Sequence, residues 1–408
     1  MTTRVPLPRT FWAFRNPSYR FLWPANFIAY ASRWMQMTLL GWFVLVETDS
    51  PWLVGLVGFF GMIPMFVLGV LGGVLADAVD RRRLLLTTQA AALLSLVSLS
   101  TLMVLDLAVY WHAYPAILVM GVAWALDMPS RRSLIHDLLG RRRVTNGVAL
   151  DSMGMSASMM IGPATAGALI DRVGVTGGYC VVTAMSVTSI LLLSRLGTGP
   201  ARPAQYDGGI LRNLADGLRY VAGHSALRAM VLITVLANLL LFPYMHMVPV
   251  MAREVLEVGP TLMGLLQAAP GMGSFAGAVG IASLTRLTHH GRLMLAGTLT
   301  AFVALLIFSQ STVYAFSLPT LLVMGIGQSG FGSMQAAMTM LLAPKGMRGK
   351  ALGVVSLAIG SGPFGALIVS SIANEYGPAP AIAAIAIAGM ASVGLVGISM
   401  PAIRARIA

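Results

Sequence analysis

Long apolar runs alternate with short polar segments along the whole chain. An α-helix needs about 20 mostly apolar residues to cross the hydrocarbon core of a bilayer. Twelve runs meet that requirement. The spans that they predict are 21–46, 52–76, 84–108, 113–136, 145–170, 178–196, 227–250, 261–284, 293–311, 316–342, 350–373 and 380–401. We therefore predict an all-α membrane protein with twelve transmembrane helices.

The longest polar segment, 197–226, divides these spans into six and six. We predict an N-terminal six-helix bundle over 1–196, a cytoplasmic linker with an amphipathic helix over 197–226, and a C-terminal six-helix bundle over 227–408. The fifth span contains MIGPATAGALI and the eleventh contains GSGPFGALIVS, which are weakly similar. Transporter folds are often built from such repeats, so the two bundles are expected to be pseudo-symmetric.

Composition excludes an ordinary soluble protein, because 57% of the residues are apolar and only 10% are charged. The net charge of +13 would suggest nucleic acid in a soluble chain. Here the basic residues lie between apolar runs, and the segments predicted to lie outside hold only Arg172 and Arg253. The positive-inside rule then predicts a bacterial inner-membrane protein with both termini in the cytoplasm. Its basic residues would contact anionic lipid headgroups, and we expect no nucleic-acid partner.

The segment GGVLADAVDRRR resembles the loop between the second and third helices of the major facilitator superfamily. The matching positions that matter most are Gly73, Asp77, Arg81 and Arg82. The resemblance implies the major facilitator fold and a conformational latch in which Asp77 contacts neighbouring helices. Ala78 and Asp80 depart from the family pattern, which implies an altered charge network. The alternative reading is a loop anchored by its arginines to anionic lipid.

The Gly-Pro element of the fifth span, Gly162, Pro163 and Gly167, resembles a motif associated with exporters in this superfamily. The stretches PYMHMVPVMAREVLEVGPTLMGLLQAAPGMGSFAGA and ALDMPSRRSLIHDLL resemble helices of its enterobactin-exporter and macrolide-efflux branch. This resemblance implies export of a drug, a macrolide or a siderophore.

Arg33 lies near the middle of the first span, where a charge costs at least about 2.5–3.5 kcal/mol. We expect it to face a central cavity and to pair with an anion, either on the substrate or on the protein. Asp127 and Asp151, in the fourth and fifth spans, are the candidate protein partners and the candidate proton-coupling groups. A carboxylate that changes protonation as a cation approaches or leaves is what proton antiport needs. The alternatives are a fixed ion pair for Arg33, a satisfied polar group near the cytoplasmic mouth for Asp127, and a pair with a cytoplasmic arginine for Asp151.

Several polar side chains within spans are candidates for binding substrate. They are Gln36, Asn238, Tyr244, His246, Gln267, Gln328 and Gln335. Buried amides also join helices, at roughly 0.6 kcal/mol each. The 27 methionines fit ordinary packing, an adaptable cavity for bulky amphiphiles, or, less readily, copper binding. We predict no metal site.

The sequence contains no phosphate-binding loop, zinc spacing or nucleophile elbow, so we predict no enzyme activity and no cofactor. The expected function is secondary active export of a small amphiphilic molecule by a monomer, with the proton gradient as energy source. The alternatives are an importer or lipid flippase of the same fold and, from other classes, a membrane sensor or scaffold or a membrane-embedded enzyme.

Overall fold

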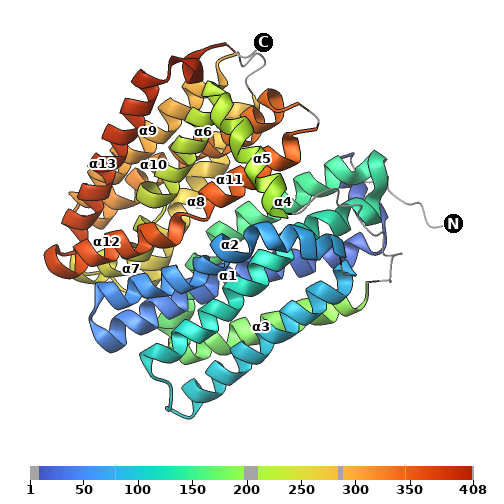
Figure 1. Ribbon diagram of the computed structural model, residues 1–408. Helices are drawn as coiled ribbons and strands as arrows, with labels where there is room; N and C mark the ends of the chain where they lie inside the picture. The colour runs from blue at the N-terminus through green and yellow to red at the C-terminus, as the bar shows by residue number, and fades with distance from the viewer. Residues whose placement is uncertain (1–8, 79, 197–209, 284–287, 345, 407–408) are drawn as a thin grey trace.

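The protein folds into two helical bundles that meet at an angle, as the computed structural model shows (Figure 1). The structure describes residues 9–78, 80–196, 210–283, 288–344 and 346–406, and these contain helices but no strand. The first bundle is built from η1 (Arg9–Arg15), α1 (Tyr19–Thr48), α2 (Pro51–Ala78), α3 (Arg81–Val104), η2 (Tyr110–His112) and α4 (Ala113–Ser194). The second is built from α6 (Ser225–Leu236), η3 (Ala237–Leu241), α7 (Tyr244–Glu254), α8 (Pro260–Ala282), α9 (His290–Ser309), α10 (Tyr314–Leu342), α11 (Arg348–Ile359), α12 (Gly362–Tyr376), α13 (Pro378–Ser399) and η4 (Pro401–Arg404). The predicted all-α architecture is confirmed.

The long element α4 is not straight, because the chain turns sharply at two glycines. Gly140 has φ 61° and Gly174 has φ 72°, values in the left-handed region that a residue with a Cβ rarely adopts. These turns divide α4 into the predicted fourth, fifth and sixth spans.

Two other predicted spans consist of consecutive helical pieces. The seventh comprises α6, the π-helical turn η3 and α7, and the eleventh comprises α11 and α12. In the described part of the chain, eight helical stretches are long and apolar enough to cross a membrane, and one of them, Arg143–Ser194, turns at Gly174 and so holds two spans. With α1, the first part of α4, and α10, they make the twelve predicted spans.

The third span is shorter than expected. Its helix, α3, ends at Val104 rather than near residue 108, because Asp106 takes a left-handed conformation with φ 54°. Apolar residues continue past this turn, which is why hydropathy alone extended the span.

The two bundles approach closely where α4 packs against α8. A Cβ at Gly167 would lie 2.2 Å from the carbonyl oxygen of Pro260, and one at Gly264 would lie 2.4 Å from that of Pro163. Small residues let membrane helices approach at such distances. A second close contact between the bundles, between α2 and α12, has Gly55 against Ser370.

We expect Gly167→Ala to lower stability by about 1–3 kcal/mol, because the new methyl group must push α4 and α8 apart. Thermal unfolding of the purified protein in detergent would measure this. The matched control is Gly353→Ala on α11, where an added Cβ meets nothing within 4 Å. Equal melting temperatures for the two variants would contradict the prediction.

Polar contacts between the bundles gather at one end of the molecule, called here the closed end. Nη1 of Arg253 lies 2.6 Å from Oδ1 of Asp49 and donates to the carbonyl oxygen of Leu45 at 3.0 Å. The backbone N–H of Thr261 donates to Oδ2 of Asp171 at 2.9 Å. Ser50 and Asn374 are hydrogen-bonded at 3.3 Å. At the opposite, terminal end, where α1 begins and α13 ends, no hydrogen bond joins the bundles among the described residues.

The amphipathic segment of the predicted linker forms helix α5 (Ile210–Gly223), which packs against α11 (Figure 1). Nζ of Lys350 lies 2.7 Å from Oδ2 of Asp216, and this hydrogen bond lowers the pKa of the aspartate. The rest of the predicted linker, 197–209, lies outside the described residues. The contact ties α5 to the second bundle.

Candidate functional site

A cavity of about 390 Å³ lies between the two bundles, and most of the predicted substrate-binding residues line it. Those residues are Arg33, Asn238, Tyr244, His246, Gln267, Gln328 and Gln335. Gln36 does not line this cavity, because its side chain points into the first bundle and Nε2 donates to the hydroxyl of Tyr179 at 2.8 Å. The structure therefore gathers residues from α1, η3, α7, α8 and α10 that are far apart in the sequence.

Most of the cavity wall is apolar and adaptable. Its methionines are Met37, Met62, Met155, Met159 and Met245. Phe242, Phe331, Trp34 and Trp124 supply flat surfaces beside them. Flexible thioethers and aromatic rings suit a ligand that is bulky and apolar rather than one fixed shape. The described residues contain no cluster of three or more His, Cys, Asp or Glu side chains that could hold a metal ion.

Some of the polar residues in this wall already bond to other protein groups. Nε2 of Gln335 donates to Oγ1 of Thr234 at 2.9 Å, and Nδ2 of Asn238 donates to the backbone carbonyl oxygen of Thr234, also at 2.9 Å. The hydroxyl of Thr38 donates to Oε1 of Gln267 at 2.6 Å, which joins the two bundles. These amides therefore hold helices together as well as lining the cavity.

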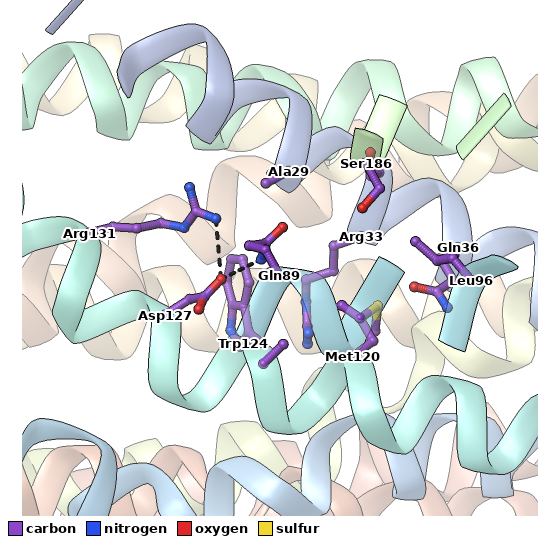
Figure 2. A pocket seen from close by; sticks show the side chains of 13 residues that line it. Ala29, Arg33, Gln36, Gln89, Leu96, Met120, Trp124, Asp127, Arg131 and Ser186 are labelled. Carbon is purple, nitrogen blue, oxygen red and sulfur yellow. Dashed lines mark hydrogen bonds and ion pairs between the residues drawn. The ribbon is translucent and has the colours of Figure 1, made fainter. Parts of the chain in front are cut away.

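Arg33 projects from α1 and lies against Trp124 of α4. Its Cζ atom is 4.4 Å from the centre of the indole ring, a cation–π contact. Its buried Nη1 atom has no hydrogen-bond partner, and Arg33 makes no ion pair among the described residues. The expectation that Asp127 or Asp151 pairs with Arg33 is wrong, because both carboxylates are held by other groups. Figure 2 shows Asp127 with its partners Arg131 and Gln89.

Among the described residues of the first bundle, Asp127 is the most enclosed carboxylate, with 2% of its surface exposed. It accepts hydrogen bonds from Thr88 and, at 2.5 Å, from Gln89, both on α3. Nη2 of Arg131, one turn further along α4, lies 3.2 Å from Oδ2 (Figure 2). A carboxylate in such surroundings is stabilised as an ion only by these partners.

Arg131 links Asp127 to the second carboxylate through a polar chain. Nη1 of Arg131 donates to Oδ1 of Asn26 at 2.5 Å, and Nδ2 of Asn26 donates to Oδ1 of Asp151 at 2.7 Å. The hydroxyl of Tyr30 donates to the other oxygen of Asp151 at 3.1 Å. We call the series Asp127–Arg131–Asn26–Asp151 the buried charge chain. It connects α4 on either side of its Gly140 turn through α1.

A second cavity, of about 50 Å³, lies inside the first bundle beside this chain. Gln36, Gln89, Asp127 and Arg131 are among its lining residues, shown in Figure 2. Arg33 and Trp124 line both this cavity and the central one. The cation–π pair is therefore the wall that the two cavities share.

Sequence reasoning missed several members of the site. Arg131 was not among the predicted site residues, but it is 1% exposed and lies inside the bundle. Its position four residues after Asp127 was the available signal, because residues i and i+4 share a helix face. Asn26, Tyr30 and Thr88 carried no comparable signal, since polar residues in spans are common.

The residues of the predicted latch make contacts within the first bundle. Arg81 pairs with Asp137 of α4, and Nη2 of Arg82 donates to the carbonyl oxygen of Ser194 at 2.6 Å. Gly73 and Asp77 belong to α2, but the surroundings of Gly73 and the side chain of Asp77 lie outside the described part of the structure. The contact that the resemblance implied for Asp77 stays a prediction.

The Gly-Pro element of the fifth span meets both the other bundle and the cavity. Gly162 packs against Trp34 of α1, Pro163 lines the central cavity, and Gly167 meets α8 as described above. The element therefore lies at the interface that must change if the bundles move.

Comparisons with known proteins agree with this architecture. The sequence matches the family described as transmembrane secretion effector over residues 9–406. It is 24% identical over 380 residues to the multidrug efflux pump Tap of Mycolicibacterium fortuitum, covering 89% of this chain and 90% of that one. It is 26% identical over 378 residues to the enterobactin exporter EntS of Shigella flexneri, covering 89% of each chain.

Solved structures with similar folds are also transporters. A POT family transporter in complex with 5-aminolevulinic acid has a TM-score of 0.75 at 12% identity, over 95% of this chain and 97% of that one. The nucleoside transporter NupG has a TM-score of 0.72 at 12% identity, over 95% and 99%. At these identities the likeness shows a shared fold.

Proposed function

Because the chain belongs to the transmembrane secretion effector family of the major facilitator superfamily, and is therefore a transporter, we propose that it exports a bulky amphiphilic small molecule in exchange for protons. The observation that carries the proposal is the pair of adjoining cavities: a large apolar one between the bundles and a small charged one beside Asp127. The names of its relatives, a multidrug efflux pump and an enterobactin exporter, favour export of a drug, a macrolide or a siderophore.

Alternating access would move the substrate through the central cavity as the bundles rock about it. The closed end holds the bundles together through Arg253, Asp49 and Asp171, while no such hydrogen bond joins the described residues at the terminal end. With the terminal end in the cytoplasm, as the positive-inside rule predicts, substrate would enter the cavity from the cytoplasm. A single chain contains the complete cavity, which favours action as a monomer.

The proton would act on the buried charge chain. Protonation of Asp127 removes the charge that holds Arg131, so Arg131 is left with Asn26 as its hydrogen-bond partner. Removing one partner from a buried ion pair changes the energy of its surroundings by several kcal/mol, on the order of 3–5. Trp124 and Arg33 line the same small cavity, so this change occurs next to the wall of the substrate site. The first bundle therefore offers a route by which proton binding could favour one arrangement of the bundles.

Transport into inverted membrane vesicles tests the proposal. A pH gradient should drive accumulation of a labelled macrolide or of enterobactin, and Asp127→Asn should lose the gradient-dependent component because an amide cannot exchange a proton. Asp151→Asn tests the other end of the chain in the same way. Asp106→Asn is the matched control, since Asp106 lies in a loop with φ 54°, a conformation that asparagine tolerates. Undiminished gradient-driven transport in both Asp127→Asn and Asp151→Asn would refute the proposed coupling.

A further inference from the structure

Two buried hydrogen-bond donors of α1, beside the central cavity, lack an acceptor. They are Nη1 of Arg33 and Nε1 of Trp34, and neither has a hydrogen-bond partner among the described residues. Buried donors are normally bonded, and leaving one unpaired destabilises the folded protein. Both side chains belong to residues that line the central cavity.

The charged lining of this cavity has a single sign, which is positive. Arg33 is the only charged residue among the described residues that line it, and no aspartate or glutamate is among them. The buried carboxylate of Asp127 lies beyond Trp124 in the small cavity, which Arg33 also lines, and it is already bonded to Thr88, Gln89 and Arg131. The positive charge of Arg33 therefore has no counter-ion in the described protein.

The surroundings of Arg33 hold its guanidinium group in place but supply no carboxylate to pair with it. Trp124 covers one face of the group at 4.4 Å, which holds the group in place and leaves its edge donors available. A guanidinium presents a planar set of N–H donors that matches the two oxygens of a carboxylate. A structural role alone would be expected to place a protein carboxylate at that edge.

We propose that the molecules exported by this protein are anionic amphiphiles, with a carboxylate or a similar oxyanion bound by Arg33 and an apolar body against the methionines and aromatic rings. The indole N–H of Trp34 is a second donor beside this site. Lipophilic cations are disfavoured, because they would meet Arg33 with no carboxylate in the wall to offset it. The inference rests on the proposed transport function and names its substrate class.

Three probes that share one apolar body test the charge preference. They are radiolabelled pyrenebutyrate, its neutral butanamide and the corresponding trimethylammonium compound, each bound to the full chain in nanodiscs, with empty nanodiscs to subtract partition into lipid. The anion should bind saturably and at least about tenfold more tightly than the cation, as charge-assisted hydrogen bonds allow. Equal or tighter binding of the cation, or no saturable binding of the anion, would overturn the inference.

Variants at Arg33 separate recognition from folding. Arg33→Gln should weaken binding of the anion about tenfold or more and leave the neutral amide within about twofold, while Arg33→Lys should retain part of the affinity for the anion. Arg219→Gln is the control, because that arginine is 82% exposed on α5 and is not among the cavity residues. Equal weakening of all three probes by Arg33→Gln would show a purely structural role and would also overturn the inference.

Gradient-driven uptake of the same probes into inverted vesicles tests the proposed function independently. Arg33-dependent binding of the anion without gradient-driven uptake would refute proton-coupled export and leave the charge preference standing. Gradient-driven uptake of all three probes without any preference would refute the charge preference and leave proton-coupled export standing.

Discussion

Arg131→Ala should destabilise the protein by about 3–5 kcal/mol, which is enough to abolish accumulation of the folded chain. The variant leaves the negative charge of Asp127 buried, with only the neutral donors of Thr88 and Gln89 to stabilise it. It also removes the donor to Asn26, which in turn orients Asp151. Thermal unfolding monitored by size-exclusion chromatography, together with the yield from membranes, would measure the loss.

The neighbouring residue provides a matched control for this prediction. Arg132 has the same side chain but is exposed, so Arg132→Ala should leave stability nearly unchanged. The double variant Asp127→Asn/Arg131→Gln should recover much of the loss, because two amides can hydrogen-bond without a buried charge. The explanation would be wrong if Arg131→Ala and Arg132→Ala melted at the same temperature.

Removing the polar contacts of the closed end should open that end of the cavity to solvent. Asp171 caps helix α8 from the other bundle, since the N-cap residue of α8 is Gly259, which has no side chain to accept a hydrogen bond. Such a cap contributes about 0.5–2 kcal/mol, and an exposed ion pair such as Arg253–Asp49 contributes up to about 1 kcal/mol. The double variant Asp171→Ala/Arg253→Ala should therefore increase the population open at this end by about tenfold.

A cysteine introduced at Met245, in the cavity wall, would report this opening through its rate of labelling by a membrane-impermeant maleimide. Cys180 is exposed and must first be replaced by serine. The matched control is Asp106→Asn/Arg172→Ala, which removes the charges of one exposed aspartate and one exposed arginine outside the interface and keeps at position 106 a residue that tolerates φ 54°. Equal labelling rates in the two double variants would exclude a gating role for the closed-end contacts.

The spans were predictable because crossing a bilayer imposes a length and a hydropathy that a sequence displays directly. The differences between the predicted spans and the helices arise where the backbone leaves the regular α-helical conformation. Asp106 ends α3 early through its left-handed conformation, and the π-helical turn η3 interrupts a run that looks uniform. Neither feature changes the hydropathy of its segment.

The site was less predictable, because its partners are chosen by three-dimensional packing. The charge of Arg33 marked it as functional, but the sequence could not show that an indole ring from α4, rather than a carboxylate, lies against it. Arg131 was not predicted as a site residue, because its partner Asn26 is 105 positions away in the sequence. Only the four-residue separation between Asp127 and Arg131 was local enough to be recognised in the sequence.

The position of Trp124 has an optical consequence. Its ring lies against Arg33 and makes an edge contact with Tyr30, at 5.6 Å between ring centres, and Tyr30 in turn bonds to Asp151. Indole emission depends on the charges beside the ring, so both the ligand site and the buried carboxylates are within its range. The chain has 7 tryptophans. A version that keeps only Trp124 would carry a native fluorophore between the two sites, able to record in real time whether their changes coincide.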